Sequence, residues 1–396
     1  MERPAPEPAA TLDLLAGGQL AFERIWRRID EARRSIHVRC FDWRDDETGQ
    51  KTAHALLRAA DRGVAITILK DRVAMHYEYL EATHQSFFHK KVALVPRLST
   101  WFLMTGYGRW GSLRQRHSPL ADALVAHKNV SVARDEKRFD HAKLFVFDDE
   151  RVIVGGMGIG DDFRLVNVDF MVEVSGADAA SRLADRYAGR VPFDPGRSFD
   201  YLLHSFQGTA TDGDGDSLAD QRLRLIDSAR NRLTVEMAYL GDDRCTDALV
   251  SAVRRGVLVT ILTSARASVI ADLNLYTCDQ LLQRTRNADN LRIILHPRMV
   301  HGKAIVIDGE WVDIGSTNFT PLSHGGYEEV NLYCHDRRFA REVEDAIARD
   351  IQEGSPAGAR VPYRGAYAWV ERAIVARQLR KTQRRVPLAG QRGGNQ

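Results

Sequence analysis

Cysteine is scarce in this sequence, and no two cysteines are close enough to form a CxxC pair. The chain has four, spread over its length: Cys40, Cys245, Cys278 and Cys334. Isolated cysteines of this kind are typical of free thiols in a reducing compartment and argue against a disulfide scaffold. We therefore expect a fold that its apolar core holds together.

Long apolar runs are also missing. Nowhere does the chain contain about 18 consecutive apolar residues, the length that a membrane-spanning helix requires. The opening residues, MERPAPEPAATLDLLAGG, lack a basic segment followed by an apolar one, so they do not predict a signal peptide. These absences predict a soluble protein, or one that touches a membrane only at its surface.

The chain has almost no excess of charge of either sign. The 56 basic and 53 acidic residues leave a net charge of +3, which gives no support to a general nucleic-acid binder. By contrast, 44% of the 396 residues are hydrophobic. This is enough for a sizeable core and for two domains or two similar halves.

Two stretches of the chain occur twice. The segment RRIDEARRSIHVRCFDW (27–43) resembles RLIDSARNRLTVEMAYL (224–240), and LLRAADRGVAITIL (56–69) resembles LVSAVRRGVLVTIL (249–262). Each copy predicts an amphipathic helix, a strand, a second helix, an Arg-Gly turn and another strand. Alternating helices and strands favour a parallel or mixed sheet covered by helices. The sequence therefore predicts an α/β protein of two duplicated halves, each a mixed sheet flanked by helices.

The repeat also sets the expected boundaries. They are a disordered N-terminus (1–18), a first half (19–195) with an insertion (72–128), a linker (196–220), a second half (221–350), and a C-terminal helix with a basic tail (351–396). Inside the linker, TATDGDGDSL faintly resembles a calcium-binding loop. It lacks the turn glycine and the final glutamate of such loops, so we interpret it as a plain linker.

A polar motif is part of this duplication. His141 and Lys143 lie two residues apart in FDHAKLFVFDDERVIVGG, so on an extended strand both side chains face the same way. In MVHGKAIVIDGEWVDIGSTNF, His301 and Lys303 recur 160 residues later. The same interval joins further pairs: Asp148 and Asp308, Gly155 and Gly315, Gly156 and Ser316, Gly158 and Asn318, Asp169 and Glu329. A purely structural repeat has little reason to keep charges at the mouths of buried strands, so we expect one functional site at the interface of the halves.

The residue types at these positions suit a phosphodiester. Lys143 and Lys303 supply positive charge, and Ser316 and Asn318 can add neutral donors to the phosphate oxygens. One histidine can attack phosphorus while the other, protonated, delivers a proton to the departing alkoxide. Two lysines can do electrostatically what a metal does elsewhere. Because no cluster with metal-ligand spacing lies near the motifs, we expect neither a metal nor another cofactor.

The paired motifs resemble the HxKxxxxD…G(S/G)xN signatures of the phospholipase D superfamily. The Gly155–Gly156 pair and the opening EARRSIHVRCFDW are most similar to the bacterial cardiolipin synthase branch, and the resemblance covers residues 20–345. It implies one active site at the pseudo-two-fold interface of the two phospholipase D-like halves, with the following roles. The catalytic residues are His141 as the nucleophile, His301 as the acid and then the base, Lys143, Lys303, Asp169 and Glu329. Phosphate contacts come from Lys143, Lys303, Asn318 and Ser316, and motif support from Asp148, Asp308, Gly155, Gly156 and Gly315. Gly158 departs from the pattern, because the family often has asparagine there.

This resemblance implies a phosphatidyltransferase. A phosphatidyl group of an anionic phospholipid would pass through a phosphohistidine to an alcohol such as phosphatidylglycerol. Water as the acceptor would make the protein a phospholipase D, and two other readings stay open: a nuclease and a module that only binds lipid. The expected location is the cytoplasm, with peripheral contact at the inner face of the cell membrane. Nucleic acid is not expected as a partner, and the oligomeric state stays open.

Three further segments have two readings each. The insertion mixes aromatic and apolar residues with cations, which suits a lipid-headgroup interface or a packed helical subdomain. Its residues are Trp101, Phe102, Leu103, Met104, Tyr107 and Trp110, with Lys90, Lys91, Arg97, Arg109, Arg114 and Arg116. The C-terminal helix, with Trp369, Ile374 and Leu379, either lies on anionic lipid or docks on the protein. Trp43 and Tyr239 either line the mouth of the site or belong to the core.

Overall fold

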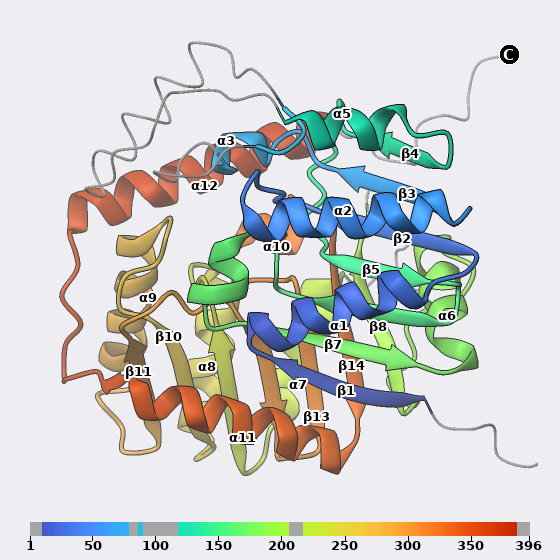
Figure 1. Cartoon of the computed structure of the whole chain (residues 1–396). Helices are drawn as coiled ribbons and strands as arrows, with labels where there is room; N and C mark the ends of the chain where they lie inside the picture. Colours follow the sequence, from blue (N-terminus) through green and yellow to red (C-terminus); the bar gives the residue numbers. More distant parts are fainter. Residues whose placement is uncertain (1–9, 79–85, 90–117, 206–216, 386–396) are drawn as a thin grey trace, which may run out of the picture.

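The computed structural model describes residues 10–78, 86–89, 118–205 and 217–385 (Figure 1). The aromatic and basic stretch of the insertion, the segment TATDGDGD and the end of the basic tail therefore lie outside the described residues. Within the described ranges, no helix is long and apolar enough to cross a membrane.

The first half forms a seven-stranded mixed sheet in the order β1-β7-β6-β5-β2-β3-β4. Its strands β2, β3 and β4 run parallel, and the other neighbours pair antiparallel. The bounds are β1 Thr11–Ala16, β2 Ser35–Cys40, β3 Ala65–Lys70, β4 Val130–Ala133, β5 Leu144–Phe147, β6 Arg151–Gly155 and β7 Phe170–Ser175.

The second half forms an eight-stranded sheet in the order β15-β11-β10-β9-β12-β13-β14-β8. Read from β8 to β11, this order matches that of the first sheet from β1 to β4 strand for strand, and only the short β15 is extra. The predicted duplication is therefore confirmed. The bounds are β8 Phe199–His204, β9 Arg232–Met237, β10 Leu258–Ser264, β11 Leu291–His296, β12 Lys303–Ile307, β13 Trp311–Gly315, β14 Glu329–His335 and β15 Ser355–Pro356.

Helices cover the outer face of each sheet, and a third apolar layer lies between the sheets. The outer cluster of the first half includes residues of α1, α2 and α5, and that of the second half residues of α7, α8 and α9. The central cluster joins strands of both sheets with α6 and α11. The helices are α1 Gly18–Glu31, α2 Glu47–Asp61, α3 Met75–Glu78, α5 Pro119–Ala126, α6 Ala177–Tyr187, α7 Leu218–Ser228, α8 Asp243–Arg254, α9 Ala271–Arg284, α10 Pro321–Gly325, α11 Arg337–Glu353, α12 Gly365–Arg385 and the π-helix η1 Asp162–Val166.

Two expected boundaries are wrong for the same reason. Thr11–Ala16 is the ordered strand β1 rather than part of a disordered N-terminus, and Phe199–His204 is the strand β8 rather than part of a linker. Each strand precedes the first helix of its half and pairs antiparallel at the sheet edge, β1 with β7 and β8 with β14. Both strands therefore belong to the repeat. The pairing that orders them is long-range, and the local sequence gave no sign of it.

Candidate active site

The two histidine motifs meet where the sheets face each other. The backbone N–H of His141 donates to the carbonyl of Glu328 at 2.8 Å, and that of His301 donates to the carbonyl of Val168 at 2.6 Å. The start of each motif thus pairs with a segment of the other half, the one that precedes β14 or β7. The parallel bridges Asp140–Glu328 and Val168–Val300 show the same pairing. This exchange brings both histidines to one interface.

The carboxylates are exchanged between the halves. Nδ1 of His141 lies 3.0 Å from Oε1 of Glu329, and Nδ1 of His301 lies 2.7 Å from Oδ2 of Asp169. A carboxylate is only an acceptor, so Nδ1 of His141 carries the proton and its Nε2 keeps a lone pair. The ring of His301 also meets Lys303, whose Nζ lies 2.9 Å from Nδ1 and 3.3 Å from Nε2. The sequence indicated both carboxylates but not which histidine each one serves.

Burial keeps the two imidazoles neutral. Loss of water lowers the pKa of His141, and Glu329 opposes that shift. The same loss of water, together with repulsion from Lys303, lowers the pKa of His301 to about 4. Burial favours the neutral acid of Glu329, but His141 and Lys143 outweigh it and hold the pKa of Glu329 below its usual value. Near neutral pH each histidine is therefore a free base beside a carboxylate.

The two lysines are almost completely buried. Lys143 and Lys303 each expose 1% of their surface, and the ammonium of each donates to the backbone carbonyl of the histidine two residues before it. Burial lowers the pKa of both, and that of Lys303 falls to about 7 with further repulsion from Lys143. An anion between the two ammonium groups would favour their charged forms. Two buried ammonium groups of this kind can therefore bind a small anion.

The loop after β13 carries Ser316 and Asn318, and the two residues differ in role. The hydroxyl of Ser316 donates to Glu329 Oε2 at 2.5 Å and accepts from the N–H of Val330. Its one proton is used, so the expectation that Ser316 binds phosphate is not supported by the geometry. Asn318 is 4% exposed, and its side-chain oxygen has no hydrogen-bond partner within the described ranges.

The matching loop after β6 has room only for glycine. A Cβ at Gly156 would lie 2.3 Å from Oδ1 of Asp169, the carboxylate that holds His301. A Cβ at Gly158 would lie 2.7 Å from the ring of Phe163 and 2.9 Å from the Cβ of Asp42. The space of the expected asparagine is thus filled by other side chains. Gly155 and Gly315 end the strands β6 and β13.

The motif aspartates support turns. Asp148 and Asp308 have positive φ of 53° and 52°, in the turns that follow β5 and β12. The carboxylate of Asp148 accepts from the backbone N–H groups of residues 33–35, and that of Asp308 from those of residues 230–232. These bonds fix the starts of β2 and β9 against the motif strands.

Aromatic rings that the sequence did not single out enclose the histidines. Phe41 lies edge-on to His141 with a centroid distance of 4.9 Å, and Tyr327 stacks on the same imidazole at 5.6 Å. Phe163 lies edge-on to His301 at 5.2 Å. Trp43, for which the sequence left open the mouth of the site or the core, is fully buried and stacks on Phe87, so it belongs to the core. The hydroxyl of Tyr239 hydrogen-bonds Ser268.

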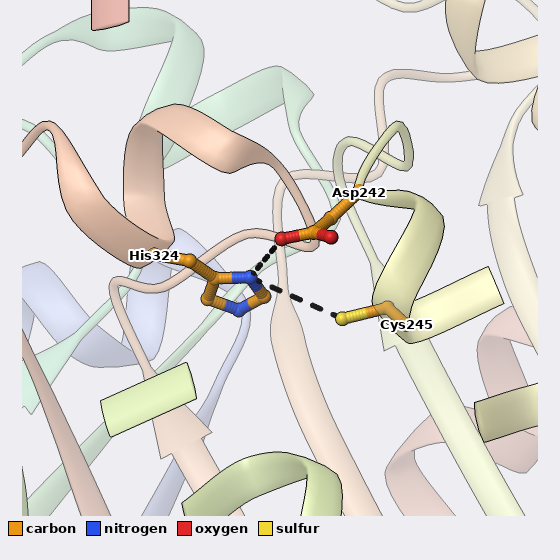
Figure 2. Close-up of side chains that lie close together, drawn as sticks. All are labelled: Asp242, Cys245 and His324. Atoms are coloured by element: carbon orange, nitrogen blue, oxygen red, sulfur yellow. Dashed lines mark hydrogen bonds and ion pairs between the residues drawn. The ribbon is translucent and has the colours of Figure 1, made fainter. Parts of the chain in front are cut away.

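One cluster in the described ranges combines the side-chain types of a metal site. Figure 2 shows the imidazole of His324 facing the carboxylate of Asp242 and the thiol of Cys245; Nδ1 lies 2.7 Å from the carboxylate and 4.0 Å from Sγ. Nε2 of the ring lies 3.2 Å from the guanidinium of Arg222, which has only donors, so both ring nitrogens are engaged. Burial raises the pKa of the Cys245 thiol, and Arg244 adds positive charge beside Asp242. This donor set does not fit a metal ion.

Arg222, which contacts His324 of this cluster, also belongs to a polar network that supports the loop of Asn318. Arg222, which is fully buried, donates to Asp313 at 2.7 Å, and the amide of Asn331 donates to the other oxygen of Asp313 at 2.6 Å. Both donors of Thr317, its N–H and its hydroxyl, bond to the side-chain oxygen of Asn331. A buried polar network thus fixes the backbone that presents Asn318.

The first half has an apolar cluster at the corresponding place. By the repeat intervals, Ile25 stands for Arg222, Ile153 for Asp313, Met157 for Thr317 and Met171 for Asn331, and all four belong to one buried cluster. The two sides of the site are therefore supported by different chemistry.

Comparison with known proteins agrees with the duplicated α/β fold. The family model described as "Cardiolipin synthase, PLD-like domain" matches residues 25–190 and 223–351. Cardiolipin synthase B of Salmonella typhi is 24% identical over 85% of this chain and 79% of its own length. Cardiolipin synthase A of Pseudomonas entomophila is 26% identical over 86% of this chain and 68% of its own. The fold matches that of phosphatidylserine synthase from Haemophilus influenzae, with a TM-score of 0.66, 13% identity and 95% of both chains covered.

Proposed function

Because the chain belongs to the phospholipase D-like family of cardiolipin synthases, we propose that it transfers a phosphatidyl group from an anionic phospholipid to an alcohol through a phosphohistidine. The observation that carries this proposal is the pair of crossed histidine–carboxylate contacts beside two buried lysines. The contact through Nδ1 leaves Nε2 of His141 available for attack, while Nε2 of His301 lies 3.3 Å from the ammonium of Lys303. The two ammonium groups provide the charge that a phosphodiester requires.

In the first step, Nε2 of His141 attacks phosphorus, and the bond from phosphorus to the leaving alcohol breaks. Binding of the phosphodiester anion raises the pKa of His301, so that its Nε2 takes up a proton from solvent and then donates it to the leaving alkoxide. The phosphorylated imidazole of His141 is cationic, and Glu329 stabilises it from Nδ1. Lys143 and Lys303 hold the equatorial oxygens as charge develops on them.

In the second step, the hydroxyl of the acceptor gives its proton to Nε2 of His301 and its oxygen attacks phosphorus. The phosphorus–nitrogen bond breaks, which restores neutral His141. With phosphatidylglycerol as both donor and acceptor, the products are cardiolipin and glycerol. With water as the acceptor, the same intermediate yields phosphatidic acid.

The surface of α12 supports contact with a bilayer beside the site. Its inner residues Val375 and Leu379 pack in one cluster with Phe41 and Tyr327, the two rings that flank His141. Figure 1 shows α12 along the edge of the molecule, next to α9 and α10. A membrane bound to the outer face of this helix would lie one layer of side chains from the active site.

The outer face of α12 has the character of an interfacial helix. Apolar side chains are exposed on its N-terminal part, where Trp369 is 72%, Val370 42% and Ile374 38% exposed. Exposed cations follow on its C-terminal part, none with a carboxylate partner in the described ranges: Arg377, Arg380, Lys381 and Arg384. Aromatic and aliphatic groups enter the headgroup boundary while lysine and arginine bind anionic lipids, at about 1 kcal/mol for each cation.

Vesicle sedimentation tests this surface. We expect the protein to bind phosphatidylcholine vesicles only when they contain phosphatidylglycerol, and we expect Trp369→Ser with Ile374→Ser to weaken that binding. Leu258→Ser is the matched control, because Leu258 is 50% exposed at the start of β10. Equal loss in the control, or none in the α12 variant, would rule out this face.

Lipid mass spectrometry after incubation with phosphatidylglycerol vesicles tests the function itself. Cardiolipin and glycerol in the wild type, and not in the His141→Ala variant, are the expected result. Phosphatidic acid in place of cardiolipin would identify water as the acceptor. No change in any phospholipid would contradict the proposal and would direct attention to nucleic-acid phosphodiesters.

A further inference from the structure

A third carboxylate lies at the active site, and none of the catalytic steps uses it. Asp42 is the second residue after β2 and follows Phe41, whose ring contacts His141. The next residue, Trp43, forms a parallel β-bridge with Ile159 in the loop after β6. Asp42 is 7% exposed, and its Oδ1 has no hydrogen-bond partner in the described ranges. A buried carboxylate oxygen without a hydrogen bond is costly, so its presence requires an explanation.

The segment of Asp42 packs closely against Gly158. The Cβ of Asp42 and the ring of Phe163 both lie within 3 Å of the position that a Cβ at residue 158 would take. The backbone carbonyl of Asp42 also accepts from the N–H of Ile159, which fixes the two segments side by side. Glycine at 158 therefore permits this close packing, and position 158 supplies no side-chain amide beside Asp42.

The second half has different side chains at the two matching positions, a tyrosine in place of Asp42 and an asparagine in place of Gly158. Tyr239 corresponds to Asp42, since its carbonyl accepts from the N–H of Phe319 as that of Asp42 does from Ile159. The hydroxyl of Tyr239 is bonded to Ser268, and in the repeat Asn318 takes the place of Gly158. One side of the site thus presents an amide that can donate, while the other presents an anion that can only accept.

The charges around Asp42 limit what it can bind. Burial lowers the pKa of Lys143 and of Lys303, and the carboxylate of Asp42 opposes that shift in both, so it lies within electrostatic reach of both ammonium groups. A phosphate oxygen would be repelled by a carboxylate. An ammonium group of a lipid would face two like charges, whereas a hydroxyl group is neutral and donates.

We propose that Asp42 binds a free hydroxyl of the alcohol group that is exchanged at phosphorus, so that the site selects polyol headgroups such as glycerol. This inference rests on the proposed transferase function. The hydroxyl next to the ester oxygen donates to Asp42, while the phosphate oxygens face the lysines and Asn318. Asp42 is then a specificity residue that touches the substrate but takes part in no bond change.

The test compares two donors at equal mole fraction in phosphatidylcholine vesicles: phosphatidylglycerol, whose headgroup has two free hydroxyls, and phosphatidylethanol, whose headgroup has none. For Asp42→Ala we expect turnover of phosphatidylglycerol to fall about 10- to 100-fold relative to phosphatidylethanol, the range of a hydrogen bond to a charged group. Asp42→Asn keeps an acceptor oxygen and should retain part of the preference. Asp289→Ala, which removes an exposed acid, is the control for net charge.

Each outcome decides the matter. An equal loss on both donors would indicate a structural role and overturn the proposal, as would an unchanged ratio of rates. A larger loss on phosphatidylethanolamine than on phosphatidylglycerol would make the ligand an ammonium and overturn it too. If the wild type consumes neither donor, the proposed function itself fails, and this inference fails with it. Asp42→Ala also removes an anion near Lys143 and Lys303, so its melting temperature is measured alongside, and the ratio of rates on the two donors, which unfolding does not change, decides the proposal.

Discussion

Glu329, at the start of the last long strand of the second half, binds the imidazole of His141 in the first half, 188 residues earlier in the chain. Asp169 makes the reciprocal contact to His301. Because each half supplies the histidine of one pair and the carboxylate of the other, the reactive groups exist only where the two halves meet.

The crossed contacts predict a selective effect on histidine titration. In Glu329→Gln we expect the pKa of His141 to fall further, because Glu329 is the group that raises it. The pKa of His301, which faces Asp169, should change less. NMR titration of isotope-labelled histidine side chains measures both, and a larger shift at His301 would contradict the crossed arrangement.

Loss of either histidine should remove nearly all turnover. His141→Ala deletes the nucleophile and His301→Ala deletes the acid and base, each a contribution of at least about 100-fold. Circular dichroism and the melting temperature should stay close to the wild type, since both side chains lie at a site rather than in the apolar core. Turnover at the wild-type rate in either variant would refute the mechanism.

Lys303 predicts an unusual rise of stability with pH. Its pKa is about 7 in the folded protein and 10.5 as a free side chain, so above pH 7 the unfolded chain binds a proton that the folded protein has released. Stability should therefore increase from pH 7 to about 8.5, by at most about 1.4 kcal/mol per pH unit. Lys303→Met should flatten this increase and abolish turnover. Chemical denaturation of both proteins across this range measures the difference.

The network under Asn318 predicts a compensating pair of substitutions. Arg222→Ile alone leaves the buried charge of Asp313 unpaired and should cost about 3–5 kcal/mol of stability. Arg222→Ile with Asp313→Ile reproduces the Ile25 and Ile153 pair of the first half and should recover much of that loss. Urea denaturation of the two variants tests this, and a double variant less stable than the single one would contradict it.

Chelation should leave activity unchanged, because the lysines supply the charge that a metal would otherwise provide. Turnover is measured before and after EDTA, and again after divalent cations are added back. Loss of activity that a metal restores would count against phosphate binding by lysine alone.

Several parts of the fold and the site could be predicted from the sequence because they repeat. The interval of 160 residues that joins His141 to His301 also joins Asp169 to Glu329, and a repeated spacing is visible without any structure. The helices and strands of the core follow from local periodicity, which is also repeated.

What the sequence could not provide depends on contacts between distant segments. The strands β1 and β8 are ordered by pairing with β7 and β14, more than a hundred residues away. Ser316 matched a phosphate-binding position, yet its hydroxyl is taken by Glu329. Gly158 was visible as a departure from the motif, but the groups that leave no room for a side chain there, the ring of Phe163 and the Cβ of Asp42, lie outside the motif.

The joining of two halves in one polypeptide has a consequence for the symmetry of the site. Two identical subunits around a two-fold axis would present the same group at both matching positions, whether an acid or an amide. Here Asp42 in the first half corresponds to Tyr239 in the second, and Gly158 corresponds to Asn318. Covalent fusion thus allows each flank of a shared centre to be changed by a single substitution without altering the other.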